Sequence, residues 1–134
     1  MPERRRITVV NDNPEFLALM DDLLGDGSGY EVTTIDGDLL HDIEPIRESH
    51  PHLLIIDLRL RREGIAGWDI LMALRADPEM RELPTILCTG DAQGLKEHAD
   101  AIAQDPRVRI LNKPFHLDEA DALVRELIGA PTAA

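Results

Sequence analysis

The stretch Leu53-Leu54-Ile55-Ile56-Asp57 decides the fold of this chain. Four consecutive large aliphatic side chains indicate a strand that is buried on both faces. Such strands are typical of parallel sheets, because helices cover both sides of these sheets. We therefore predict a central parallel strand over residues 53–56, with the carboxylate of Asp57 at its carboxyl end.

The rest of the chain alternates between short apolar runs and amphipathic stretches. Further strands are predicted over residues 6–10, 30–35, 84–88 and 108–111. Helices are predicted from Asn13-Pro14 to the glycines at 25, 27 and 29, and over about 39–46, 67–74, 93–103 and 117–128. Strands that alternate with helices predict an α/β fold, a (βα)5 parallel sheet joined by right-handed crossovers.

Composition restricts the class of protein. The chain has 134 residues, 43% of them hydrophobic and only 3% aromatic, which fits one domain with an aliphatic core. The net charge of -12 disfavours direct binding to nucleic acid. The one cysteine, Cys88, lies in an apolar run and is interpreted as a small buried residue. A single cysteine cannot form an internal disulfide, which favours a reducing compartment.

Membrane and export signals are missing from the sequence pattern. No apolar stretch approaches the ~20 residues that a membrane-spanning helix needs. The basic start over residues 1–6 is not followed by the long apolar stretch of a signal peptide. We therefore expect a cytoplasmic location without membrane contact.

Polar residues follow the predicted strands where ligands of open α/β sheets bind, at the carboxyl ends. These strand ends are Asn11-Asp12, Asp57, Thr89-Gly90 and Asn112-Lys113-Pro114. Two carboxylates suit Mg²⁺, and a carboxylate beside Mg²⁺ can act as a nucleophile towards phosphorus. Lys113 and Thr89 offer donors to phosphoryl oxygens. If the ends converge, the pattern predicts a site for phosphoryl transfer.

In order and spacing, these residues resemble those of response-regulator receiver domains of the flavodoxin-like, chemotaxis-regulator type. The resemblance is carried by residues 9–16, 54–58, 83–89 and 112–115, and it covers about residues 5 to 128. It implies a doubly wound five-stranded parallel sheet in the order 2-1-3-4-5. It also implies a single receiver domain over 1–134, with a core of about 5–128 and a frayed tail over 129–134.

The resemblance implies a role for each site residue. Asp57 would be the phosphoacceptor, Thr89 the switch hydroxyl and Lys113 the phosphate-binding lysine. Mg²⁺ would be the cofactor, held by Asp12, by Asp57 and by the backbone carbonyl of Arg59. The domain would catalyse only its own phosphorylation and autodephosphorylation, so we do not expect an enzyme in the ordinary sense.

Three features depart from the family pattern. Asn11 replaces the first acid, which normally holds a metal-bound water; an amide can still accept a hydrogen bond from water, but losing one charge should weaken Mg²⁺ binding by ~1 kcal/mol or more. In the loop over 59–66, Arg61 replaces a common proline, and the matching glycine, Gly67, comes about two residues late. Ile110 replaces the aromatic residue that swings inward in the family, which puts that form of the switch in doubt.

The resemblance also implies partners. A histidine kinase or a histidine phosphotransfer protein would donate the phosphoryl group. A downstream protein would bind the face formed by the fourth helix, the fifth strand and the fifth helix. Direct contact with nucleic acid or a membrane is not expected, and the state would be a monomer or a weak phosphorylation-dependent dimer.

Three other functions compete with this interpretation. A pseudo-receiver, which binds partners without phosphorylation, is favoured by Asn11 and opposed by Asp12, Asp57 and the other site residues. A phosphatase of the haloacid-dehalogenase type needs a second acid two residues after the nucleophile, where this chain has Arg59. A flavodoxin needs Gly, Ser and Thr donors after the first strand, where residues 11–15 are acidic and lack them.

Overall fold

The computed structural model describes residues 4–58 and 66–132. Its sheet has five parallel strands in the order β2-β1-β3-β4-β5. The strands are β1 (Arg6–Asn11), β2 (Glu31–Asp36), β3 (Leu53–Ile56), β4 (Thr85–Thr89) and β5 (Val108–Asn112). The predicted fold class and strand order are confirmed.

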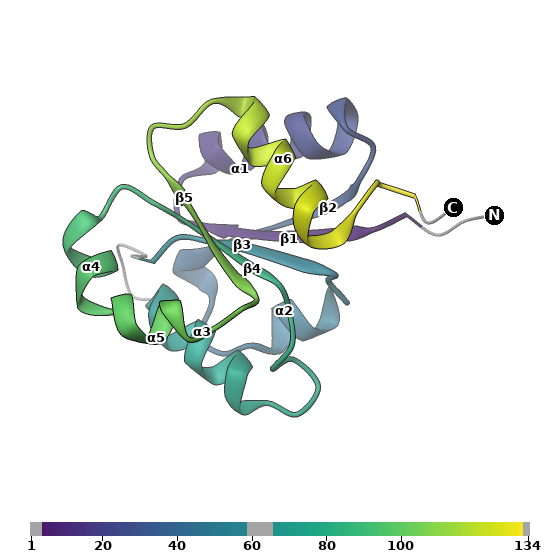
Figure 1. Cartoon of the computed structure of the whole chain (residues 1–134). Coiled ribbons are helices and arrows are strands. Elements are labelled where there is room, and N and C mark those ends of the chain that lie inside the picture. Colours follow the sequence, from purple (N-terminus) through teal and green to yellow (C-terminus); the bar gives the residue numbers. More distant parts are fainter. Residues whose placement is uncertain (1–3, 59–65, 133–134) are drawn as a thin grey trace.

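Helices cover both faces of the sheet. Figure 1 shows α1 and α6 on one face and α2, α3, α4 and α5 on the other. The helical segments are α1 (Pro14–Met20), the π-helical turn η1 (Asp21–Gly27), the 3-10 turn η2 (Gly37–Leu39), α2 (Glu44–Glu48), α3 (Gly67–Ala76), α4 (Ala92–Glu97), α5 (Ala99–Ala103) and α6 (Leu117–Ile128). None of the helices in the described part of the chain has the length and apolar character needed to cross a bilayer.

Two cores lie on the two faces of the sheet, because successive side chains of a strand point to opposite sides. Ile55 of β3 packs in the core under α1 and α6, together with Met20 and Val124. Its neighbour Ile56 packs in the other core, together with residues of α3 such as Ile70. The β3 side chains are almost completely buried, as predicted for a strand covered on both faces.

The start of α1 follows the predicted cap. The side chain of Asn13 accepts hydrogen bonds from the backbone N–H groups of Glu15, at 2.9 Å, and Phe16, at 3.4 Å. Pro14 occupies the first helical position, where its missing N–H would have had no partner in the helix. This local geometry fixes the chain direction immediately after the end of β1.

Two helix predictions are wrong in extent. The helix predicted over about 39–46 is a short turn, η2, followed by the short helix α2, and Leu39 is 74% exposed rather than in a core. The carboxylate of Asp36 accepts the N–H of Asp38 at 3.0 Å and so starts the turn. The helix predicted over 93–103 is divided at His98, whose backbone leaves the helical region with φ -110° and ψ 12°.

The segment after α6 was predicted to be a frayed tail, but its described part, residues 129–132, is held by hydrogen bonds. The backbone N–H of Arg5 donates to the carbonyl of Pro131 at 2.6 Å, and Arg4 forms an antiparallel bridge with Thr132. The hydroxyl of the buried Tyr30 donates to the carbonyl of Gly129 at 2.6 Å. These bonds tie the end of α6 to the amino ends of β1 and β2.

Candidate functional site

The strand ends converge at the carboxyl edge of the sheet. The register of β1 and β3 pairs Val10 with Ile56, so the next residues, Asn11 and Asp57, follow side by side. On the other side of β3, β4 ends at Thr89, and Thr89 is paired with Asn112 of β5. Asp57 therefore directly follows β3, which lies between β1 and β4, and the ends of both these strands also carry predicted site residues.

A direct contact in the site joins Asp57 to Lys113. The Lys113 Nζ lies 2.8 Å from the Asp57 Oδ2, and the two side chains are 32% and 13% exposed. A charge-assisted hydrogen bond of this length holds the ammonium against the carboxylate. The structure thus brings together two residues that are far apart in sequence and that the sequence pattern had assigned to one site.

Aromatic side chains position Lys113, and one of them, Phe16, lies in the motif over residues 9–16 but was given no role in the site by the sequence pattern. The Lys113 Nζ lies 4.8 Å from the centroid of the Phe16 ring, a distance at which a cation is attracted to an aromatic face. Phe16 in turn meets Phe115 edge to face, with the ring centroids 6.4 Å apart. The only sequence signal for this arrangement was the pair of phenylalanines beside the two motifs.

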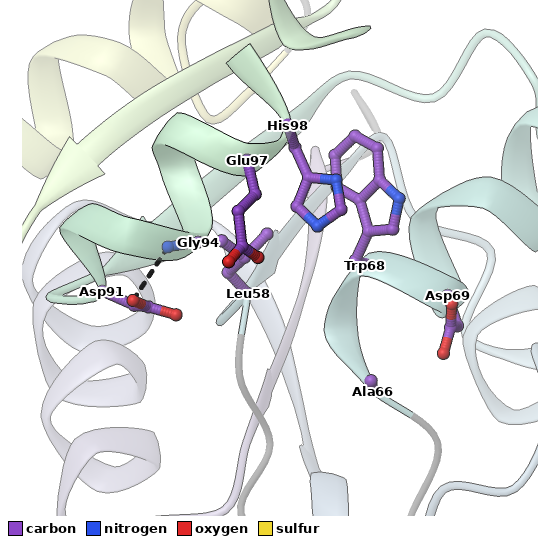
Figure 2. Close-up of a pocket in the computed structure, with 8 residues that line it drawn as sticks. All are labelled: Leu58, Ala66, Trp68, Asp69, Asp91, Gly94, Glu97 and His98. Atoms are coloured by element: carbon purple, nitrogen blue, oxygen red, sulfur yellow. Dashed lines mark hydrogen bonds between the residues drawn. The ribbon is translucent and has the colours of Figure 1, made fainter.

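Thr89 links the site to α4. Its side chain is 1% exposed, and its Oγ1 accepts the N–H of Asp91 at 3.0 Å. The Asp91 carboxylate then caps α4 by accepting the N–H of Gly94 at 2.9 Å, the dashed bond in Figure 2. Thr89 also accepts, through its carbonyl, the N–H of Lys113 at 3.0 Å. Thr89 is therefore bonded to Lys113 directly and to the first turn of α4 through Asp91.

The remaining predicted residues are placed as follows. Asp12 is half-buried and comes directly after β1. Asn11 is 1% exposed, and its Oδ1 accepts the N–H of Asn13 at 2.9 Å. Arg59 and the two other arginines of its loop, Arg61 and Arg62, lie outside the described residues.

Gly67 approaches the backbone of Asp57 so closely that no side chain fits. A Cβ atom built on Gly67 would stand 1.9 Å from the carbonyl oxygen of Asp57 and 3.0 Å from that of Leu58. Gly67 begins α3, so this contact fixes the start of α3 against the end of β3. Close packing thus requires a glycine at position 67, although it comes about two residues later than the matching glycine of the family pattern.

A cavity of about 260 Å³ lies beside this packing point, between the start of α3 and α4 (Figure 2). Trp68 and His98 stack at its edge, with ring centroids 3.9 Å apart and planes 13° apart. Carboxylates of Asp69, Asp91 and Glu97 also line it. Trp68 packs at the start of α3 and stacks there on His98, which lies about thirty residues later in the chain.

Cys88 is a buried thiol on β4, in agreement with its interpretation as an apolar core residue. Burial raises the pKa of the Cys88 thiol to about 12, with smaller opposing effects of the charges on Lys113 and Asp57. A thiol that is both buried and protonated is a poor nucleophile. Cys88 therefore takes no part in the chemistry that this edge of the sheet can support.

The donor set suits a magnesium ion better than a softer metal. In the described ranges, no three His, Cys, Asp or Glu side chains are grouped so that they could hold a metal. Mg²⁺ does not need such a cage, because it commonly uses one or two carboxylates together with waters and phosphate oxygens. The carboxylates of Asp12 and Asp57, which follow adjacent strands, match that donor set.

Comparisons with known proteins identify the family of this chain. The sequence model of the response regulator receiver domain matches residues 7–125. The polar-differentiation response regulator DivK of Brucella ovis is 28% identical over 126 residues, which are 93% of this chain and 97% of DivK.

Solved structures have the same fold. The receiver domain of a sensor histidine kinase from Pseudomonas aeruginosa PAO1, with a magnesium ion in its active-site cleft, is 25% identical with a TM-score of 0.74, covering 95% of this chain and 99% of that one. The response regulator TrrA of Thermotoga maritima, in complex with Mg²⁺ and BeF, is 24% identical with a TM-score of 0.71. The match covers 92% of this chain and 99% of TrrA. With the family match over most of its length, this chain belongs to the response regulator receiver domain family, the signalling modules of two-component systems.

Proposed function

We propose that this chain acts as a single phosphoacceptor receiver domain in which Asp57 takes a phosphoryl group from a histidine kinase or a histidine phosphotransfer protein. The observation that carries the proposal is the 2.8 Å contact between Lys113 Nζ and Asp57 Oδ2 at the carboxyl edge of the sheet. Phosphoryl transfer depends mainly on positioning and on neutralising charge, and this contact supplies both.

The transfer uses groups of this chain in defined roles. A carboxylate oxygen of Asp57 forms a bond to phosphorus while the bond from phosphorus to the donor histidine nitrogen breaks, and the proton that this nitrogen needs comes from solvent. Lys113 stabilises the charge on the phosphoryl oxygens, and its side chain stays in place against Phe16. Mg²⁺, when held by Asp12, Asp57 and the carbonyl of Arg59, supplies further neutralisation of that charge.

The output passes through Thr89. Its hydroxyl can turn towards a phosphoryl oxygen, which weakens the hydrogen bond that it now accepts from Asp91. Because Asp91 caps α4, the cap responds to the state of Asp57. The predicted output face, which consists of α4, α5, β5 and α6 in this structure, then changes its affinity for a downstream protein.

Intact-mass measurement tests the proposal. The protein is incubated with Mg²⁺ and acetyl phosphate, and one phosphoryl group is expected on the wild type and none on Asp57→Asn. The matched control is Asp36→Asn at the end of β2, two strands away from Asp57, where an amide can replace the carboxylate as acceptor for the N–H of Asp38. Asp36→Asn should be phosphorylated like the wild type, whereas Lys113→Ala should react about tenfold more slowly or worse.

The second candidate function is a pseudo-receiver, and the substitution of an amide at Asn11 is the observation that favours it. A pseudo-receiver would be folded and would bind partners, but neither acetyl phosphate nor a phosphorylated histidine phosphotransfer protein would add mass to it. That result would reject phosphorylation as the signal.

A further inference from the structure

Asn11 lies on the same side of the sheet as the Asp57 carboxylate. Ile7 and Val9 of β1 belong to the core under α1 and α6, as do Leu53 and Ile55 of β3. Since side chains alternate along a strand, the next residues of these two series, Asn11 and Asp57, continue on that side. The register of β1 and β3 sets them level with each other on neighbouring strands.

The amide of Asn11 is fixed in orientation. Its Oδ1 accepts the backbone N–H of Asn13 at 2.9 Å, and only the oxygen of an amide can accept that hydrogen. The other end of the amide is therefore the nitrogen. In the described part of the chain, this Nδ2 is buried and has no hydrogen-bond partner, although the residue is only 1% exposed.

A buried donor without a partner is unusual, because most buried polar groups are hydrogen-bonded. Here the donor stands one strand away from the proposed phosphoacceptor and on its side of the sheet. An acid at this position would offer only acceptor oxygens, whereas Asn11 offers two N–H hydrogens and its acceptor oxygen is held by the N–H of Asn13. This polarity suits an anionic oxygen and does not suit the hydrogens of a metal-bound water.

We propose that Asn11 Nδ2 donates a hydrogen bond to an oxygen of the phosphoryl group on Asp57. Asn11 is then a phosphoryl-binding residue beside Lys113, in place of the expected role as acceptor for a metal-bound water. The inference rests on the proposed function, because it needs a phosphoryl group on Asp57. It implies that the substitution of the acid lowers metal affinity and raises affinity for the phosphoryl group.

Two separate titrations test this. Binding of beryllofluoride, which mimics a phosphoryl group on a carboxylate, is followed by fluorine NMR at saturating Mg²⁺, and Mg²⁺ binding alone is followed by calorimetry. For Asn11→Asp we expect Mg²⁺ to bind several-fold more tightly and beryllofluoride to bind at least about tenfold more weakly, since a hydrogen bond to a charged group is lost. Asn13→Asp adds the same charge two residues away and keeps the helix cap, so it should behave like the wild type.

Asn11→Ala separates the lost donor from the added charge. It should bind Mg²⁺ like the wild type and beryllofluoride about tenfold more weakly, and thermal unfolding confirms that it is folded. Beryllofluoride binding by Asn11→Ala or Asn11→Asp that is as tight as in the wild type would overturn the role of Asn11 and leave the phosphoacceptor function intact. A wild type that binds no beryllofluoride and is not phosphorylated would instead overturn the proposed function, and this inference with it.

Discussion

At the amino ends of the strands, polar groups join distant segments of the chain, whereas at the carboxyl ends a carboxylate and an ammonium meet beside a buried donor. The N–H of Arg6 donates to His52 Nδ1, and the N–H of His52 donates to the carbonyl of Arg6, both at 2.8 Å. At the opposite edge, Asn11 Nδ2 has no partner among the described residues. The reciprocal bonds at the amino edge stabilise the fold, while at the carboxyl edge the buried donor lies next to the residues of the proposed site.

The largest expected effect concerns the close packing at the carboxyl edge. Gly67→Ala places a methyl group where the Asp57 carbonyl oxygen stands, so the start of α3 has to move. We expect a loss of about 3 kcal/mol in the free energy of unfolding, measured with urea, and a matching loss of phosphorylation. Gly90→Ala is the control at the same edge, because its Cβ would meet the Lys113 Cβ at an ordinary 3.7 Å. Equal stability of the two variants would contradict the packing account.

The next effect concerns the pH dependence of Cys88. Its pKa is raised by burial from 9.0 to about 12. Because the folded pKa lies above the unfolded one, the contribution of this thiol to stability is complete below pH 9 and is lost as the pH rises towards 12. By pH 10 the free energy of unfolding should have fallen by about 1.4 kcal/mol through this thiol. Urea unfolding at pH 8 and pH 10 should show a smaller decrease in Cys88→Ala than in the wild type; an identical decrease would contradict the assignment.

The smallest effect concerns the amino edge. Tyr30→Phe removes the hydrogen bond from the buried hydroxyl to the carbonyl of Gly129 and leaves that carbonyl without this donor. We expect the free energy of unfolding to fall by about 1 kcal/mol. Phosphorylation by acetyl phosphate should proceed at the wild-type rate, since the bond lies at the far edge of the sheet. A changed rate would show that the two edges are coupled and would weaken the comparison drawn above.

Most of the fold could be predicted from sequence because its strands are short aliphatic runs bounded by turn residues. The run at 53–56 and the helix at 117–128 have the bounds that their patterns predicted. Asn13 and Pro14 gave the start of α1 correctly, since a cap depends only on neighbouring residues. Local chemistry was sufficient at these places.

The errors arose in two predicted helices, where the pattern of apolar residues did not reveal a turn in one and a break in the other. Leu39 looked like part of a helix face, but the turn that begins at Asp36 points it into solvent. The break at His98 accompanies stacking on Trp68, a contact between residues thirty positions apart that no periodicity reports. Tertiary contacts of this kind override local propensity.

The site was predictable as a set of residues but not as a geometry. Asp57 and Lys113 were assigned to one site by their positions after strands, and their contact agrees with that assignment. The roles of Asn11 and Phe16 depend on which atom faces which neighbour, and a sequence carries no record of that. Among residues 4–58 and 66–132, the Asn11 amide nitrogen has no hydrogen-bond partner, and the bond from the Asn13 N–H to the amide oxygen defines which end of the amide this is.

The bridge between Arg4 and Thr132 has a practical consequence for protein engineering. It sets the two ends of the described chain next to each other, at the edge of the sheet opposite Asp57. A short flexible peptide joining these ends, with new ends opened in an exposed turn, would give a circular permutant. Such a rearrangement would let a fluorescent protein or a second domain be attached beside α4, close to Thr89, without altering any residue of the proposed site.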